Sequence, residues 1–149
     1  MSAKPFVVTP DNLPRPLDIV GEQITILASK TATHSFEIFL QDGPEGSGPP
    51  PHSHDWDEAF YVTRGEIEFG FNEKQMTATP GTLVHLPAGT VHWFRFGKGG
   101  GQMISVTGQG SGASGLFTDL AEGIPSGEPD IEKILSIAKR HKVTFVLEK

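Results

Sequence analysis

Short runs of residues that alternate between apolar and polar side chains, each closed by glycine or proline, recur along most of this chain. In the run 66–71, Ile67, Phe69 and Phe71 alternate with two glutamates and a glycine. A period of two places the apolar side chains on one face of a β-strand. The 18 glycines and 12 prolines lie between such runs rather than in one tail, and therefore mark turns. This pattern predicts an all-β protein.

The alternating runs predict about eight strands joined by short connections. The expected strands are 23–28, 34–41, 52–63, 66–71, 75–79, 82–86, 91–96 and 102–106. Turns are expected at 64–65, 72–74 and 80–81, and loops at 42–51 and 97–101. So many short strands in one chain of 149 residues favour a closed barrel or a double-sheet jelly roll.

The segments on either side of this core differ from it in pattern. We expect a single domain over residues 1–149, with an irregular N-terminal arm at 1–22 and the barrel core at 23–107. The C-terminal part, 108–149, begins with a Gly/Ser stretch at 108–115 that predicts a flexible linker. A helix is then expected at about 130–140, packed on the outside of the barrel, and a last strand at 143–147. Asp130 is the expected N-cap, and apolar residues recur at helical spacing: Ile131, Ile134, Leu135 and Ala138.

Composition excludes several classes of function. The chain has no cysteine, which excludes disulfides, thiolate metal sites and a cysteine nucleophile and fits a cytoplasmic location. Its formal net charge of −6, without a Lys/Arg cluster, makes nucleic acid and anionic membranes poor partners. No apolar run reaches the roughly 20 residues of a membrane-spanning helix. The expected partner is a small molecule or a second copy of the chain.

Two segments contain the residues suited to metal chemistry. His52 and His54 are two residues apart, so on a strand both point to the same side, and Glu58 shares their parity. His92 lies on a separate strand that a barrel can bring opposite them. Three imidazoles and one carboxylate suit a divalent transition metal, and four protein ligands leave coordination positions open for a substrate.

The arrangement of these residues resembles the cupin superfamily. The family's first motif, G(X)5HXH(X)3,4E(X)6G, matches completely at Gly46, His52, His54, Glu58 and Gly65. Its second motif, G(X)5PXG(X)2H(X)3N, matches at Gly81, Pro87, Gly89 and His92, whereas Phe96 replaces the final asparagine. The resemblance implies a double-stranded β-helix with one divalent metal ion per chain, held by His52, His54, Glu58 and His92. The ion would be Fe, Mn, Ni, Co, Cu or Zn.

Several segments further resemble bacterial quercetin-dioxygenase-type cupins with one domain, including 24–29, 49–54, 57–62 and the tail 134–143. This resemblance implies an O₂-dependent dioxygenase that acts on a small enolic or aromatic substrate. Glu58 would then be both a metal ligand and the catalytic proton acceptor.

Other functions fit the same motifs, because one fold can carry many activities. The alternatives are a non-catalytic binding protein with a structural metal, and another metal-dependent cupin enzyme such as an isomerase, cyclase or decarboxylase. A decarboxylase would need a basic group in the cavity, but Arg95 has the opposite parity to His92 and should point outward. A sensor is disfavoured because we find no effector segment in the sequence.

Aromatic and apolar residues near the motifs are candidates for a substrate pocket, although packing in the core is the commoner role of such residues. They share strand parity with the expected ligands or lie on the apolar side of their own strand: Phe36, Phe60, Val62, Phe94 and Phe96. We also expect a homodimer, since paired copies would bury exposed sheet edges with the help of the arm 1–22.

Overall fold

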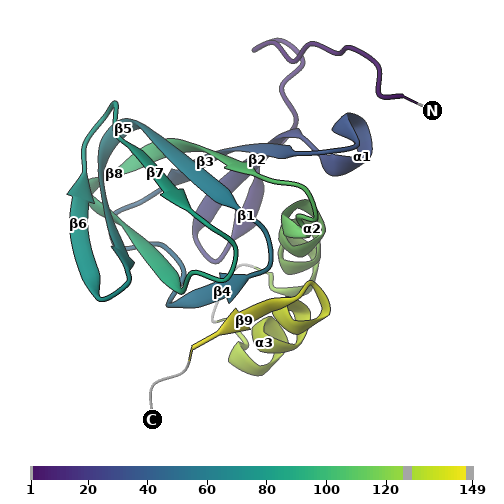
Figure 1. Cartoon of the computed structure of the whole chain (residues 1–149). Coiled ribbons are helices and arrows are strands. Elements are labelled where there is room, and N and C mark those ends of the chain that lie inside the picture. The colour runs from purple at the N-terminus through teal and green to yellow at the C-terminus, as the bar shows by residue number, and fades with distance from the viewer. Residues whose placement is uncertain (1, 126–128, 147–149) are drawn as a thin grey trace.

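A computed structural model describes residues 2–125 and 129–146 of the chain. The strands form one strongly curled antiparallel sheet, and two of the helices lie at the C-terminal end of the chain (Figure 1). In chain order the elements are β1 (Leu17–Ile19), β2 (Glu22–Ala28), α1 (Lys30–Thr33), β3 (Glu37–Gly43), β4 (His52–His54), β5 (Glu58–Phe71), β6 (Lys74–Ala78), β7 (Leu83–Leu86), β8 (His92–Thr107), α2 (Ala113–Gly123), α3 (Ile131–Arg140) and β9 (Val143–Phe145). This arrangement confirms the predicted all-β fold of the jelly-roll type.

The two longest strands, β5 and β8, pair along their whole length and form the centre of the sheet. On the edge of β8 opposite to β5, the C-terminal part of β8 pairs with β3, from which the sheet continues through β2 to β1, and its first residue pairs with β4, which leads to β9. The strands β6 and β7 pair only with β5. The predicted hairpin at 72–74 is confirmed, because Asn72 and Glu73 both have positive φ angles, as a tight hairpin turn requires.

Two predicted connections are wrong, since residues 64–65 and 97–101 lie within the continuous strands β5 and β8. Their glycines permit close packing instead of chain reversal. Gly65 has a φ of +73° beside a register shift, and a Cβ atom at this position would overlap the carbonyl of Gly100. Glycine therefore allows the two bulged strands to approach each other closely.

The predicted strand 34–41 begins later, at Glu37, because α1 and a left-handed His34 precede it. Its inward face is also the opposite of the predicted one. Glu37, Phe39 and Gln41 are buried, whereas Phe36 is 42% exposed. The apolar side of this strand therefore faces outward.

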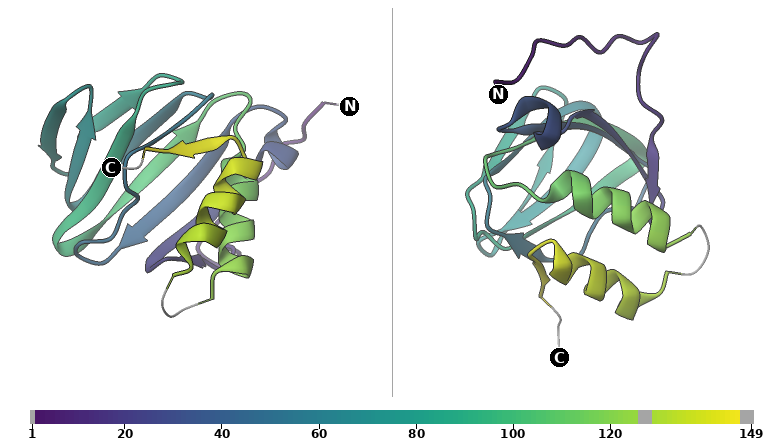
Figure 2. Two further views of the ribbon diagram at one scale, coloured as in Figure 1. Left: turned by 90° about the horizontal axis from the view of Figure 1, so that it is seen from below. Right: turned by 90° about the vertical axis from the view of Figure 1, so that its right-hand side faces the viewer.

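The C-terminal helices lie next to each other across one end of the curled sheet (Figure 2). The helix α3 matches the predicted segment, and the Asp130 side chain caps it by accepting a hydrogen bond from the Lys133 amide. The helix α2 begins at Ala113, so the predicted flexible stretch 108–115 is partly helical. The strand β9 follows, although Leu147, in the predicted last strand, lies outside the described residues. In the predicted arm, residues 2–16 contain no helix or strand.

The buried apolar side chains form two clusters. One fills the curled sheet between β5, β7 and β8 and includes Phe60, Phe69, Phe94 and Phe96. The other lies between β2, β3 and the two C-terminal helices. The histidines of β4 and β8 lie at the border between these clusters. The two C-terminal helices cover this end of the sheet, where the candidate site is found (Figure 2).

Candidate metal centre

Three histidines converge where the short strand β4 joins the sheet. His52 and His54 lie on β4 and point to the same side, as their spacing predicted. His52 is the direct antiparallel partner of His92, the first residue of β8. One ring nitrogen from each histidine lies within 4.8 Å of the others, so the three side chains form a group able to hold a metal ion.

Each of these imidazoles is oriented by a nearby backbone carbonyl. The Nδ1 atoms of His52, His54 and His92 lie 2.9, 3.0 and 2.9 Å from the carbonyl oxygens of Pro50, Trp56 and Thr90. A neutral imidazole that donates Nδ1–H to a carbonyl has a free lone pair on Nε2, the atom that then binds a metal. Burial, followed by the neighbouring His92, lowers the pKa of His52 to about 4, and this ring is therefore uncharged at neutral pH.

Glu58, at the start of β5, faces the same group. Its Oε1 atom is 3.1 Å from His54 Nε2 and 3.6 Å from His92 Nε2. Burial raises the pKa of Glu58, but the hydrogen bond with His54 and the nearby imidazoles of His54 and His92 outweigh that effect and lower the pKa to about 2. The side chain is therefore a buried carboxylate at neutral pH.

The four polar side chains lack a positive charge when the histidines are neutral. If His54 donates its single proton to Trp56, its Nε2 and the Glu58 carboxylate are two acceptors in contact. Buried His92 Nε2 also lacks a hydrogen-bond partner among the described residues. A buried acceptor without a donor costs about 1–3 kcal/mol. A divalent transition-metal ion fits this donor set, because it would satisfy the nitrogens and neutralise the carboxylate.

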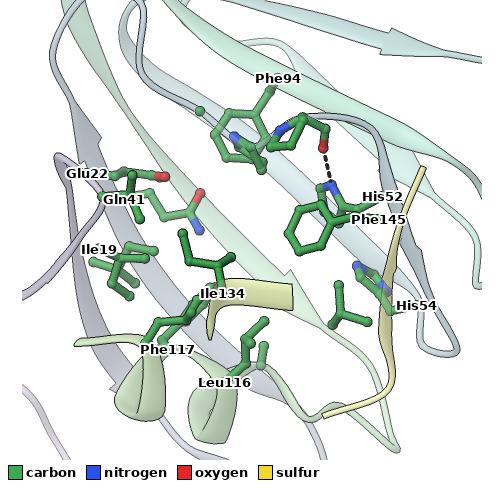
Figure 3. Close-up of a pocket in the computed structure, with 18 of the residues that line it drawn as sticks. Ile19, Glu22, Gln41, His52, His54, Phe94, Leu116, Phe117, Ile134 and Phe145 are labelled. Atoms are coloured by element: carbon green, nitrogen blue, oxygen red, sulfur yellow. Dashed lines mark hydrogen bonds between the residues drawn. The ribbon is translucent and has the colours of Figure 1, made fainter. Parts of the chain in front are cut away.

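A cavity of about 280 Å³ opens beside these residues and is lined mainly by apolar side chains (Figure 3). This volume is at the lower end of the range for small-molecule pockets. Its walls come from both core clusters and from α2, α3 and β9, and they include Ile24, Trp56, Leu116, Phe117, Ile134 and Phe145. The chain therefore places an apolar chamber next to a group of metal-binding side chains.

The five candidate pocket residues have different positions. Phe60 and Phe94 line the cavity. Val62 and Phe96 are buried in the cluster inside the curled sheet and are not among the lining residues. Phe36 is on the outer surface, and its assignment to the pocket is wrong because β3 presents its odd-numbered residues to the interior.

Sequence reasoning missed three polar or aromatic residues of the site. Trp56, which was not among the predicted site residues, is 3% exposed and stacks on His54. Glu22 and Gln41 are buried in the cavity wall and lie outside both motifs. Burial, followed by the charge of Glu58, raises the pKa of Glu22 to about 8. The one sequence signal for Glu22 and Gln41 was their place in the alternation of β2 and β3, which puts them on the inward face. Their polar side chains argued against an inward position.

A curled antiparallel sheet with three histidines converging at one end is the arrangement found in cupins. The family model described as a cupin domain matches residues 39–106, the segment that contains both histidine motifs, and this match supports a small cupin. Among curated proteins, quercetin 2,3-dioxygenase of Bacillus subtilis is 28% identical over 91 residues. This match covers 59% of the present chain and 27% of that protein, so the chain spans about a quarter of the length of this relative.

Solved structures support the same fold. An RmlC-like cupin from Shewanella frigidimarina superposes with a TM-score of 0.64 at 16% identity, over 73% of this chain and 95% of that chain. A protein from Thermotoga maritima described as a predicted oxalate decarboxylase gives 0.61 at 23% identity, over 70% and 99%. The polyketide cyclase RemF from Streptomyces resistomycificus gives 0.60 at 18% identity, over 70% and 80%. At these identities the likeness establishes the fold alone. Within the described residues, no helix is both long and apolar enough to span a bilayer.

Proposed function

We propose that the protein is a metal-dependent cupin dioxygenase of the quercetinase type, which uses O₂ on a small enolic or aromatic substrate. His52, His54, Glu58 and His92 hold one divalent ion of Fe, Mn, Ni, Co, Cu or Zn. The observation that carries this proposal is the convergence of three oriented Nε2 atoms and one carboxylate next to an apolar cavity. The similarity to a quercetin 2,3-dioxygenase supports the choice of reaction.

The residues of the chain have distinct roles in this reaction. A bound metal would supply Lewis-acid chemistry towards an enolate oxygen and O₂. Phe60 and Phe94 hold the apolar body of the substrate and exclude water. The Glu58 carboxylate, which faces the same cavity, accepts the proton of the substrate hydroxyl at its Oε atom.

Metal analysis combined with O₂ uptake tests this proposal. Protein purified without an affinity tag should contain close to one transition-metal ion per chain, and His52→Ala/His92→Ala should contain none. Flavonols and other enols should then cause O₂ consumption by the loaded wild type only. Metal binding without any turnover would favour the non-catalytic alternative, and a chain that takes up no metal even after reconstitution would refute both.

The residues that line the cavity help to judge one alternative enzyme class, the acid decarboxylases. Among the described residues that line it, none is lysine or arginine. Arg95 is exposed on the outer face of β8, as its parity predicted. A substrate carboxylate would therefore find no protein cation in this chamber, which disfavours an acid decarboxylase.

A homodimer is supported by an apolar row on the outer face of the sheet. Leu40 pairs with Ile104, Ile104 with Tyr61, and Tyr61 with Leu83, so the four side chains cross β3, β8, β5 and β7 in register. Tyr61 and Leu83 are 46% and 63% exposed. A second copy that covers this row would remove it from water. Light scattering should give a dimer mass for the wild type and a monomer mass for Leu83→Asp, and a wild-type monomer at micromolar concentration would refute the proposal.

A further inference from the structure

Two buried polar side chains lie next to each other in the cavity wall, away from the histidines. Glu22 on β2 is 6% exposed and Gln41 on β3 is 2% exposed. Gln41 pairs with Ile24, so Glu22, two residues before Ile24, is its diagonal neighbour on the inward face. Figure 3 shows both side chains extending into the cavity from one wall, with His52 and His54 on the other side.

These two side chains lack the partners that buried polar groups normally have. The Oε1 atoms of Glu22 and Gln41 have no hydrogen-bond partner among the described residues. Their neighbours in the wall, such as Ile19, Ile24 and Phe117, are apolar and offer no side-chain donor. Burying polar groups in this way is unfavourable unless a donor is supplied. No strand pairing or helix cap in the described structure uses either side chain, and the cavity is the remaining direction from which a donor can come.

We propose that Glu22 and Gln41 form a hydrogen-bonding subsite for a hydroxyl group at the end of the ligand that is remote from the metal centre. The ligand class is therefore an apolar, preferably aromatic, compound that carries a phenol or alcohol at that end. Binding of the ligand's other end to the metal rests on the proposed function. The hydroxyl subsite itself does not depend on the proposed function. The hydroxyl donates to Gln41 Oε1 and accepts a hydrogen bond from the carboxyl group of Glu22.

The chemistry of the wall favours a neutral hydroxyl over a charged group. Because burial raises the pKa of Glu22 to about 8, its carboxyl group keeps its proton at neutral pH and is a donor as well as an acceptor. A ligand carboxylate would bring a second negative charge near that of Glu58, and the described lining has no lysine or arginine to pair with it. An ammonium group would require the loss of the Glu22 proton and burial of two charges among apolar side chains. A hydroxyl satisfies both side chains without any net charge.

Binding of two matched small probes tests the subsite. Phenol and toluene have nearly the same shape, and only phenol carries a hydroxyl. Their dissociation constants are measured by NMR titration with metal-free protein in the absence of O₂. We expect phenol to bind about tenfold or more tightly than toluene, because an analogue without the hydroxyl leaves the buried polar groups unpaired. Glu22→Leu and, independently, Gln41→Leu should abolish this preference.

Two control variants separate this subsite from other polar groups. Thr107→Val removes a buried hydroxyl that does not line the cavity and should keep the preference for phenol. His92→Ala removes a candidate metal ligand and should also keep it. Equal binding of the two probes, no binding of either, tighter binding of benzylamine than of phenol, or a preference that survives in both leucine variants would overturn the proposal. Since neither metal nor O₂ takes part, failure of the dioxygenase proposal would leave these outcomes unchanged.

Discussion

The imidazole of His54 lies flat against the indole of Trp56, with ring centroids 4.3 Å apart and planes inclined by 7°. The same tryptophan accepts the Nδ1–H of His54 at its backbone carbonyl, 3.0 Å away. One residue therefore fixes both the plane and the tautomer of this histidine. Because the side chain is 3% exposed, the stack is protected from water and the imidazole has little freedom to rotate.

This stack predicts that Trp56 reports metal binding. In a Trp93→Phe background, Trp56 is the single tryptophan of the chain. Titration with Co²⁺ or Ni²⁺ should strongly quench its fluorescence, because an ion on His54 Nε2 lies within a few ångströms of the indole. The signal should saturate at one equivalent and disappear in His54→Gln. Quenching that persists in His54→Gln would show that the ion binds elsewhere.

The hydrogen bonds of Glu37, which lies outside the cavity lining, predict an effect of its substitution on the stability of the fold. Its fully buried carboxylate accepts hydrogen bonds from Ser111 Oγ at 2.7 Å and from the backbone amides of Ser114 and Lys30 at 3.1 and 2.9 Å. It thereby connects β3 to the first turns of α1 and α2. Glu37→Gln should lower the free energy of unfolding by about 1–3 kcal/mol, because an amide NH₂ group would replace one acceptor oxygen.

Chemical denaturation measures this loss, and Ser111→Ala is the matched control. This variant removes the hydroxyl that donates to Glu37 and accepts from the Ala113 amide, but it keeps the carboxylate and its two backbone donors, so it should cost about 1–2 kcal/mol. An unchanged midpoint for Glu37→Gln would contradict the connecting role assigned to Glu37.

The convergence of the three histidines could be predicted from the sequence because their positions follow from local geometry, whereas their role as metal ligands stays a prediction. Spacing of two on a strand brings His52 and His54 to one side, and the motif brings His92 opposite them. The role of Glu58 as a ligand stays a prediction. The inward face of β3 could not be predicted correctly, since its outward face carries Ile38 and Leu40 and its inward face carries the buried polar residues Glu37 and Gln41. Alternation identifies an apolar face, but it does not identify which face is covered by the rest of the chain.

Glu22 predicts a pH dependence of stability in metal-free protein. Its pKa is raised from 4.5 to about 8 on folding, so between these values the folded state binds more protons than the unfolded state. Stability contributed by this group is therefore complete below pH 4.5 and is lost as the pH rises through about 8. Glu22→Gln removes this loss. Its stability relative to wild type should increase by up to about 1.4 kcal/mol per pH unit across the interval.

Urea denaturation at pH 5, 6, 7 and 8 in the presence of a chelator measures that difference. Groups common to both proteins cancel, so only the Glu22 contribution remains. A difference that stays constant with pH would mean that Glu22 keeps an ordinary pKa in the folded protein. A wild type that becomes relatively more stable towards pH 8 would reverse the sign and contradict the prediction.

The oriented histidines predict that metal stabilises the folded chain. In the unfolded chain the three ligand atoms are far apart, whereas folding brings them within 4.8 Å. An ion present at one hundred times its dissociation constant should add about 2.7 kcal/mol, which corresponds to a rise in Tm of roughly 5–10 °C for a chain of this length. Thermal melts with and without Co²⁺ or Zn²⁺ measure the shift, which His92→Ala should abolish. His141→Ala, which removes a histidine paired with Asp119 at 2.6 Å outside the three-histidine group, should keep the shift even if its own Tm is lower. Equal shifts in His92→Ala and wild type would place the stabilising ion away from this centre.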